Sequence, residues 1–207
     1  MTDNTNDIDR LQKVIPEVKE WTERNFPLSV IYDPAVGLLE EVGELSHAIL
    51  KRYQGIRTNE DHIADGIDAV GDCTVYILHM VSLSDSFDWA KLKSYYEDMQ
   101  PKGKERSVNH PYRGSLALAF DERGMDPGIG LALQSGIETG RLLHNINIYG
   151  KCVFNGAGTI RQLAYVLTVL DMIAKQFDSL MIDCLEVTWK QVKKRDWIKT
   201  NQLAFDI

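Results

Sequence analysis

The chain has 207 residues, 44% of them hydrophobic and 26% charged, and its 23 Lys and Arg stand against 30 Asp and Glu for a formal net charge of −7. This composition is that of a folded globular protein with a buried core, and it excludes a disordered or fibrous chain. The acidic balance disfavours a nucleic-acid partner, because phosphates are met by a basic surface.

Neither the cysteines nor the hydropathy pattern indicates an exported or membrane-bound protein. Cys73, Cys152 and Cys184 form no CxxC pair or Cys/His cluster, which argues against structural zinc and a disulfide framework. The polar first nine residues lack the apolar stretch of a signal peptide, and no run reaches the length of a membrane span. We expect a soluble, cytoplasmic protein with no membrane partner.

The first half of the chain is patterned as helices. Apolar residues recur at three- and four-residue steps from Leu11 to Trp21, and Pro16 predicts that this helix begins there or is kinked. Asp33 followed by Pro34 is a helix-start signal, so the next helix is predicted over 34–54 and closed by Gly55. Two further helices are predicted over 59–83 and 86–97.

Residues 100–130 change character and are rich in Pro, Gly and basic side chains. Three more helices are predicted after them, over 131–148, 159–177 and 179–197. Alternating apolar and polar runs with hairpin turns are nearly absent from the sequence, so the predicted fold class is all-α, a helical bundle.

A weak internal similarity suggests a repeat. Residues 39–44 align with 133–138, residues 53–57 align with 148–151, and a long apolar helix follows in both halves. Chance similarity between two amphipathic helices explains the match equally well. We expect a first, catalytic helical unit at residues 1–99, a linker or insertion at 100–129, and a second helical unit at 130–207 that ends in a basic tail. If the repeat is real, the second unit is a degenerate copy of the first.

Acidic residues are distributed unevenly along the sequence. No Lys or Arg occurs between Arg57 and Lys91, whereas seven Asp and Glu do: Glu60, Asp61, Asp65, Asp68, Asp72, Asp85 and Asp88. Helical geometry places the middle aspartates on one stripe, where like charges repel by roughly 0.2–0.5 kcal/mol per pair. The stripe is either a solvated face or a face that a divalent cation neutralises.

The preceding predicted helix carries a matching set. Glu40, Glu41 and Glu44 cover about a third of its circumference, away from its apolar stripe. The short connection makes the two helices antiparallel neighbours, and hard oxygen ligands in this number suit Mg²⁺ or Mn²⁺. Three mid-helix glycines, each roughly 1 kcal/mol worse than Ala, indicate close approach of a backbone or ligand: Gly43, Gly66 and Gly71.

These residues resemble a known family. The segment Glu40-Glu41-Val42-Gly43-Glu44 is similar to the EExxE element of the MazG-like all-α nucleoside triphosphate pyrophosphohydrolases, of the same superfamily as dimeric dUTPases, and residues 68–78 resemble that family's second acidic element. Residues 20–26 and 189–197 resemble the flanks of a MazG-like subgroup. The resemblance covers roughly residues 10–95 and 185–198, and 100–130 have no counterpart in it.

The resemblance implies metal-dependent hydrolysis of a nucleoside triphosphate between the α and β phosphates, giving monophosphate and pyrophosphate. It implies three groups of site residues. The catalytic residues would be Glu40, Glu41 and Asp68, and the Mg²⁺ or Mn²⁺ ligands Glu41, Glu44, Asp68 and Asp72. Lys51, Arg57, Lys193 and Arg195 would hold the phosphates, whereas Trp21 and Asn25 would contact the base, although Trp21 also lies on its helix's apolar period. The resemblance does not identify which nucleobase or sugar the substrate carries.

One position departs from the family pattern. The second element is usually ExxD, but Ala69 stands three residues before Asp72, and Asp68 is the expected substitute. A catalytically impaired nucleotide-binding regulator, or a structural helical dimer, therefore remains an alternative. The Glu44–His47 spacing also fits a di-iron site, but no second ExxH exists. The family tendency favours a homodimer, and the repeat an internal pseudo-dimer.

Overall fold

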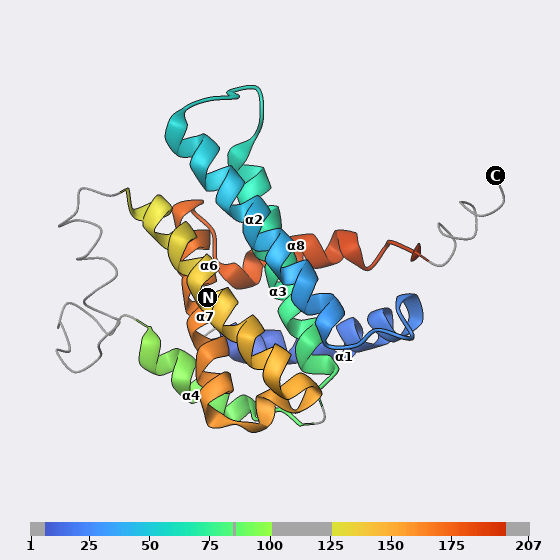
Figure 1. Ribbon diagram of the computed structural model, residues 1–207. Helices are drawn as coiled ribbons and strands as arrows, with labels where there is room; N and C mark the ends of the chain where they lie inside the picture. The colour runs from blue at the N-terminus through green and yellow to red at the C-terminus, as the bar shows by residue number, and fades with distance from the viewer. Residues whose placement is uncertain (1–6, 85, 101–125, 198–207) are drawn as a thin grey trace, which may run out of the picture.

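The computed structural model describes residues 7–84, 86–100 and 126–197, and within these ranges it contains helices and no strand (Figure 1). The all-α prediction is confirmed. The helices are α1 (Asp7–Asn25), α2 (Tyr32–Gln54), α3 (His62–Ser82), α4 (Trp89–Met99), α6 (Pro127–Tyr149), the 3-10 helix η1 (Gly150–Asn155), α7 (Ala157–Gln176) and α8 (Met181–Val192). None of these helices is long and apolar enough to cross a bilayer.

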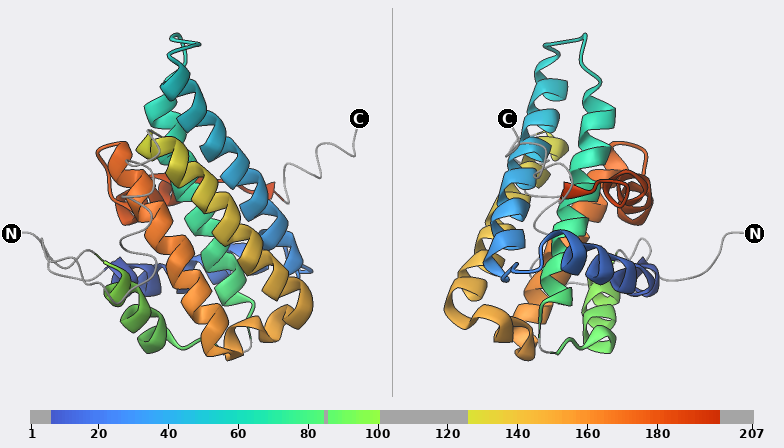
Figure 2. Two further views of the ribbon diagram at one scale, coloured as in Figure 1. Left: turned by 60° about the vertical axis from the view of Figure 1, so that its left-hand side comes forward. Right: turned by 90° about the vertical axis from the view of Figure 1, so that its right-hand side faces the viewer.

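Four long helices form the centre of the molecule. α2 and α3 make one antiparallel hairpin, and α6 and α7 make a second. α2 packs against α6 and α3 packs against α7, so the four helices run side by side (Figure 2). The free end of the α2–α3 hairpin projects beyond the rest of the bundle (Figure 1).

The two hairpins are alike in length, and each leads into a helix that packs on the other hairpin. α2 and α6 have 23 residues each, and α3 and α7 have 21 and 20. α4 comes after the first hairpin and packs on α7, whereas α8 comes after the second and packs on α3. The helix that follows each hairpin thus packs on the other hairpin, an exchange that is expected of a fused pseudo-dimer. The repeat itself stays a prediction, since the sequence match between the halves is weak.

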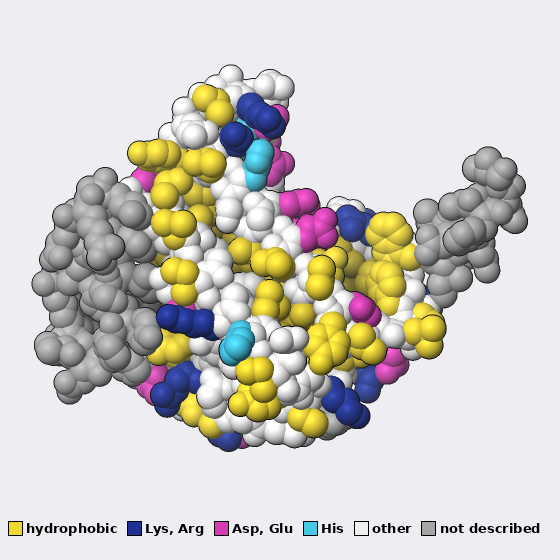
Figure 3. All heavy atoms as spheres, viewed as in Figure 1, with side chains coloured by type: hydrophobic (Ala, Val, Ile, Leu, Met, Phe, Trp, Pro, Cys, Tyr) yellow, Lys and Arg dark blue, Asp and Glu magenta, His cyan; other side chains and the backbone are white. Residues whose placement is uncertain are grey.

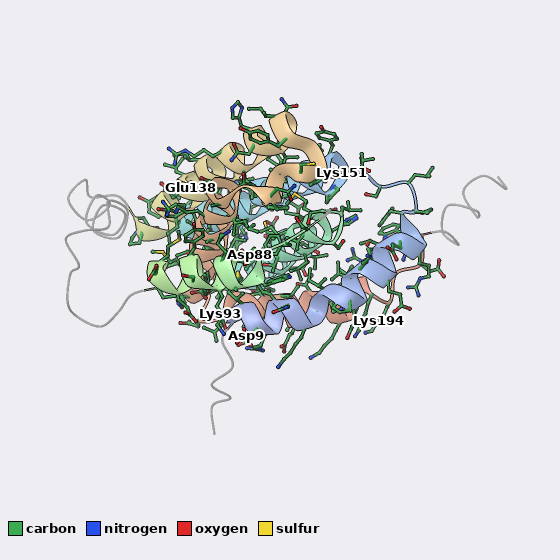
Figure 4. All side chains as sticks on the ribbon, turned by 90° about the horizontal axis from the view of Figure 1, so that it is seen from below. Asp9, Asp88, Lys93, Glu138, Lys151 and Lys194 are labelled. Atoms are coloured by element: carbon green, nitrogen blue, oxygen red, sulfur yellow. The ribbon has the colours of Figure 1, made fainter. Side chains whose placement is uncertain are left out.

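α1 crosses one end of the bundle and is tied to α4 and α8. Its Asp9 lies next to Lys93 of α4, with 2.7 Å between Oδ2 and Nζ (Figure 4). Its Arg10 lies 2.6 Å from Glu186 of α8, between Nη2 and Oε1. These pairs are partly exposed and contribute roughly 0–1 kcal/mol each, so the buried apolar face of α1 contributes most of its attachment.

Three predicted helix starts differ from the observed ones. α1 begins nine residues before Pro16 and continues through it. Asp33 does not cap α2, because its Oδ2 accepts the backbone N–H of Val30 at 2.9 Å and the helix begins at Tyr32, two residues before the predicted start. Asp61 caps α3 by accepting the N–H of Ala64 at 3.1 Å, so this helix begins at His62. Gly55 closes α2 in the left-handed conformation, as predicted.

The second half also departs from its predicted boundaries. Asp126 caps α6 by accepting the N–H of Gly128 at 2.8 Å, so α6 begins inside the segment predicted as a linker. α8 ends at Val192, and the segment after it, here called the 193–197 strap, leaves the helix at Lys193 and runs back toward α1. Residues 101–125 of the predicted linker and 198–207 of the predicted tail lie outside the described residues.

Two of the mid-helix glycines allow close helix packing. A Cβ on Gly71 would overlap the Thr188 side chain and lie 2.8 Å from the carbonyl oxygen of Cys184, so only glycine lets α8 approach α3 this closely. A Cβ on Gly66 would overlap the ring of Phe177. Gly43 has no atom within 4 Å of a Cβ position and instead faces an open cavity.

We expect Gly71→Ala to lower the free energy of unfolding by roughly 1–3 kcal/mol, because the added methyl group forces α3 and α8 apart. Urea unfolding followed by circular dichroism measures the change. Gly136→Ala, in the exposed interior of α6 with open space around it, is the matched control and should stabilise by up to about 1 kcal/mol. Equal effects of both substitutions would contradict the packing argument.

Candidate functional site

The α2–α3 hairpin brings the predicted carboxylates together. Glu41 of α2 and Asp72 of α3 are half-buried between the helices, whereas three further carboxylates are exposed beside them. These are Glu40, Glu44 and Asp68. The pKa of Glu41 is raised to about 8, first by burial and then by the charges of Asp72, Glu44, Glu40 and Asp68, so the other four carboxylates all act on Glu41. We call these five residues the carboxylate cluster, and Figure 3 shows acidic side chains along one edge of the projecting hairpin.

The carboxylate cluster has no ion-paired cation among the described residues. None of its five carboxylates forms an ion pair with a described Lys, Arg or His. Burial and the neighbouring Asp68 raise the pKa of Asp72 to about 6, and Arg195 opposes this only in part. The tight packing of α2 on α3 therefore holds like charges together against their repulsion.

One member of the cluster is fixed by α8. Thr188 Oγ1 donates a hydrogen bond to Asp68 Oδ1 at 3.2 Å. This contact exists because Gly71, one turn along α3, leaves room for the Thr188 side chain. Asp68, which we predicted to replace the glutamate missing at Ala69, is thus oriented by a helix about 120 residues away in the sequence.

Whether this cluster suits a divalent cation depends on donor type, charge and arrangement. Its donors are carboxylate oxygens, the ligands that Mg²⁺ and Mn²⁺ prefer, and the raised pKa values show an unmet demand for positive charge. Within the described ranges, however, no three His, Cys, Asp or Glu side chains are arranged to hold a metal ion. The residues fit such an ion in chemistry and charge, and its binding would require their side chains to move closer together.

A cavity of about 530 Å³ opens on one side of the cluster, between α2 and α3. Three cluster members line it together with five other residues: Glu40, Glu44 and Asp68, and Gly43, His47, Ala48, Asp65 and Ala69. Ala69 thus lies in the wall of this cavity, where the family pattern has a glutamate. His47 and Asp65 were not among the predicted site residues, although Asp65 lies on the predicted acidic stripe.

A second cavity, of about 320 Å³, lies beside Asp72 where α1, α3 and the strap meet. Its lining is mainly aromatic and apolar: Trp21, Thr22, Phe26, Ser29, Asp33, Asp72, Val75, Tyr76, His79, Val192 and Trp197. Asp68 lines the first cavity and Asp72, one turn further along α3, lines the second. The carboxylate cluster therefore stands between a polar cavity and an aromatic one.

Tyr76 connects the second cavity to the cluster. Its ring occupies the space that a Cβ on Gly37 would need, so it packs directly on α2. Burial and the charges of Glu41 and Asp72 raise the pKa of its hydroxyl, which stays protonated as a hydrogen-bond donor. Tyr76 was not predicted as a site residue, although its place four residues after Asp72 puts it on the same helix face.

The two residues predicted to contact a base hold the strap instead. Asn25 uses both polar atoms within the chain, since Oδ1 accepts the N–H of Trp197 at 2.9 Å and Nδ2 donates to the carbonyl of Trp21 at 2.9 Å. Trp21 Nε1 donates to the carbonyl of Arg195 at 3.2 Å. Trp21 also lines the aromatic cavity, and Asn25 is not among the described residues that line it.

The four side chains predicted to bind phosphate lie in different parts of the structure. Arg195 acts electrostatically on Asp72 and Tyr76, which places it beside the cluster. Lys193 is paired with Glu17 of α1, 3.1 Å between Nζ and Oε2. Lys51 and Arg57 lie toward the tip of the hairpin and line neither cavity, and Arg57 contacts Glu60 at 3.4 Å.

The second hairpin carries a neutralised counterpart of the cluster. Glu138, which aligns with Glu44 in the predicted repeat, is only 2% exposed (Figure 4). Its carboxylate accepts hydrogen bonds from Gln134, Arg141 and Gln162. Amides and one guanidinium here satisfy the carboxylate that would otherwise be buried without partners.

Compared with models of known protein families, with curated proteins and with solved structures, the chain shows no significant match.

We expect Glu41→Gln to stabilise the protein at pH 8 and not at pH 4.5. The folded state retains the Glu41 proton up to a pKa of about 8, whereas the unfolded chain releases it near 4.5, so the free energy of unfolding falls as the pH rises between these values. Because Glu41 is half-exposed, solvent screening reduces the effect, and we expect a rise in Tm on the order of 2–4 °C at pH 8.

Thermal scans at both pH values in the absence of divalent cations test this. Glu20→Gln, at an exposed position of α1, is the control for losing one negative charge. A lower Tm of Glu41→Gln at pH 8 would show that the cluster is not held together against repulsion.

Proposed function

We propose that this protein is a divergent MazG-like nucleoside triphosphate pyrophosphohydrolase, which cleaves a nucleoside triphosphate to monophosphate and pyrophosphate with Mg²⁺ or Mn²⁺. The observation that carries the proposal is the carboxylate cluster, which has no neutralising cation among the described residues and lies between a polar and an aromatic cavity. In a metal-bound nucleoside triphosphate, the metal would match the carboxylate cluster, the phosphates the polar cavity and the base the aromatic cavity. The proposed activity also agrees with the resemblance of residues 40–44 and 68–78 to that family.

In this proposal Glu41, Glu44, Asp68 and Asp72 would hold the cations. A bound cation would supply positive charge to the phosphate oxygens and favour in-line attack. Arg195, whose charge acts on Asp72, would add a positive charge beside the cluster. The Tyr76 hydroxyl, kept protonated by its raised pKa, can donate a hydrogen bond to a substrate oxygen.

Two exposed carboxylates, Glu40 and Asp68, are candidates for orienting the attacking water. Both line the larger cavity, but Asp68 alone has one oxygen fixed by Thr188, which leaves the other oxygen in a defined direction. A fixed acceptor orients a water molecule better than a mobile one. We therefore assign water positioning to Asp68 and a supporting role to Glu40.

The nucleoside is assigned to the aromatic cavity. Its volume of about 320 Å³ is at the small end of ligand pockets, enough for a nucleoside but not for a whole triphosphate. The triphosphate would then extend past Asp72 to the larger cavity. A chain acting alone or as a homodimer is compatible with this arrangement, since α8 and the strap already supply Thr188 and Arg195 from the second half.

Release of pyrophosphate should be assayed with canonical and modified nucleoside triphosphates, with and without Mg²⁺ or Mn²⁺. We expect metal-dependent release that falls at least 100-fold in Glu44→Gln, because this nearly isosteric change removes a ligand charge. Glu20→Gln should retain full activity. Nucleotide binding without turnover of any triphosphate would instead identify a binding-only or regulatory protein, with Ala69 as the physical cause.

A second prediction concerns the orientation of Asp68. We expect Thr188→Val to lower kcat about 10-fold with little change in KM, because the hydroxyl that fixes Asp68 is lost while the volume is kept. Thr188→Ser keeps the hydroxyl and should restore most of the rate. A loss of rate in both variants would show that Thr188 acts through packing alone.

A further inference from the structure

Two polar side chains of the aromatic cavity have no hydrogen-bond partner among the described residues. His79, in the last turn of α3, is 6% exposed, and its Nε2 is unpaired there. Ser29, in the connection between α1 and α2, lines the same cavity, and its Oγ is also unpaired. Buried polar atoms without partners are destabilising, and each requires an explanation.

His79 is a neutral hydrogen-bonding group rather than a charged one. Burial lowers its pKa to about 4, and the nearby Asp33 offsets this only in part. At neutral pH its ring therefore offers one donor and one acceptor nitrogen. A neutral imidazole and a hydroxyl together can bind the edge of an uncharged heterocycle.

The other walls of the cavity select the same kind of ligand. Trp21 and Phe26 pack edge to face, with ring centroids 5.6 Å apart, and Tyr76 and Trp197 complete the aromatic lining. No Lys or Arg is among the described residues that line this cavity, whereas Asp33 and Asp72 are. The lining therefore disfavours a phosphate and favours a flat ring with polar groups on its edge.

We propose that His79 and Ser29 are the specificity-determining residues of this protein, which hydrogen-bond the edge of the nucleobase in the aromatic cavity. The proposal rests on the proposed function only in taking the base to be part of the triphosphate substrate. The protein then discriminates among bases by these hydrogen bonds. A base that leaves the polar atoms of His79 and Ser29 without partners binds more weakly than a base that hydrogen-bonds to them.

The test compares His79→Phe, His79→Gln and Ser29→Ala with the wild type. For each protein, kcat and KM are measured on the four canonical ribonucleoside and four deoxyribonucleoside triphosphates, and binding of the corresponding monophosphates is measured by calorimetry. We expect His79→Phe and Ser29→Ala each to lower kcat/KM for the preferred base about 10-fold, mainly through KM, and to reduce the preference among bases.

Two variants separate recognition from folding. His79→Gln keeps a neutral donor and acceptor and should retain kcat/KM within about 3-fold of the wild type. His144→Phe replaces a histidine of α6 outside both cavities and should leave all rates unchanged. Tm values for all variants show whether a loss reflects unfolding.

An equal loss of kcat/KM for every base in His79→Phe and Ser29→Ala would overturn the specificity role, as would unchanged preferences in both. If the wild type hydrolyses no triphosphate, the proposed function fails, but calorimetry still decides the present proposal. Base-dependent monophosphate binding that His79→Phe removes would support it. Absence of monophosphate binding to the wild type would contradict it.

Discussion

The structure depends on the close packing of α2 against α3, which forces carboxylates of like charge together. Gly37 admits the ring of Tyr76 between the two helices, and Glu41 and Asp72 are half-buried beside it. Burial and mutual repulsion raise the pKa of both acids. Because no described cation is paired with these groups, the apolar packing of the hairpin must hold them in place. The repulsion among these carboxylates makes the cluster a candidate site for a cation.

α8 and the strap after it add side chains from the second half of the chain to the surroundings of the carboxylate cluster. Gly71 lets α8 approach α3, so Thr188 reaches Asp68. The strap then returns to α1, where Trp21 and Asn25 hold its backbone and Trp197 closes the aromatic cavity. Among the described residues, the polar cavity is lined by α2 and α3 alone, whereas the aromatic cavity also needs Val192 of α8 and Trp197 of the strap. Substrate orientation in the proposed reaction would depend on the same contacts.

The two hairpins treat their half-buried or buried carboxylates differently: those of α6–α7 have hydrogen-bond partners, and those of α2–α3 repel one another. In α6–α7, Glu138 is buried and receives hydrogen bonds from Gln134, Arg141 and Gln162. In α2–α3, the corresponding region is exposed to two cavities and keeps its repulsion. A satisfied buried carboxylate stabilises a helix pair, whereas an unsatisfied cluster favours a ligand. One chain therefore combines a supporting hairpin with a candidate binding hairpin.

The sequence by itself determined the helices, the partnership of α2 with α3 and the approach of their carboxylates, because helical periodicity and a short connection depend on local chemistry. It did not determine the role of Asn25, since the strap that occupies its side chain is about 170 residues distant. Tyr76 shares a helix face with Asp72, whereas Thr188 carried no local signal that marks a site residue. Only the tertiary structure brought Thr188 to Asp68 and Trp197 to the cavity beside Asp72, because contacts between distant helices depend on where side-chain volume, as at Gly71, allows a close approach.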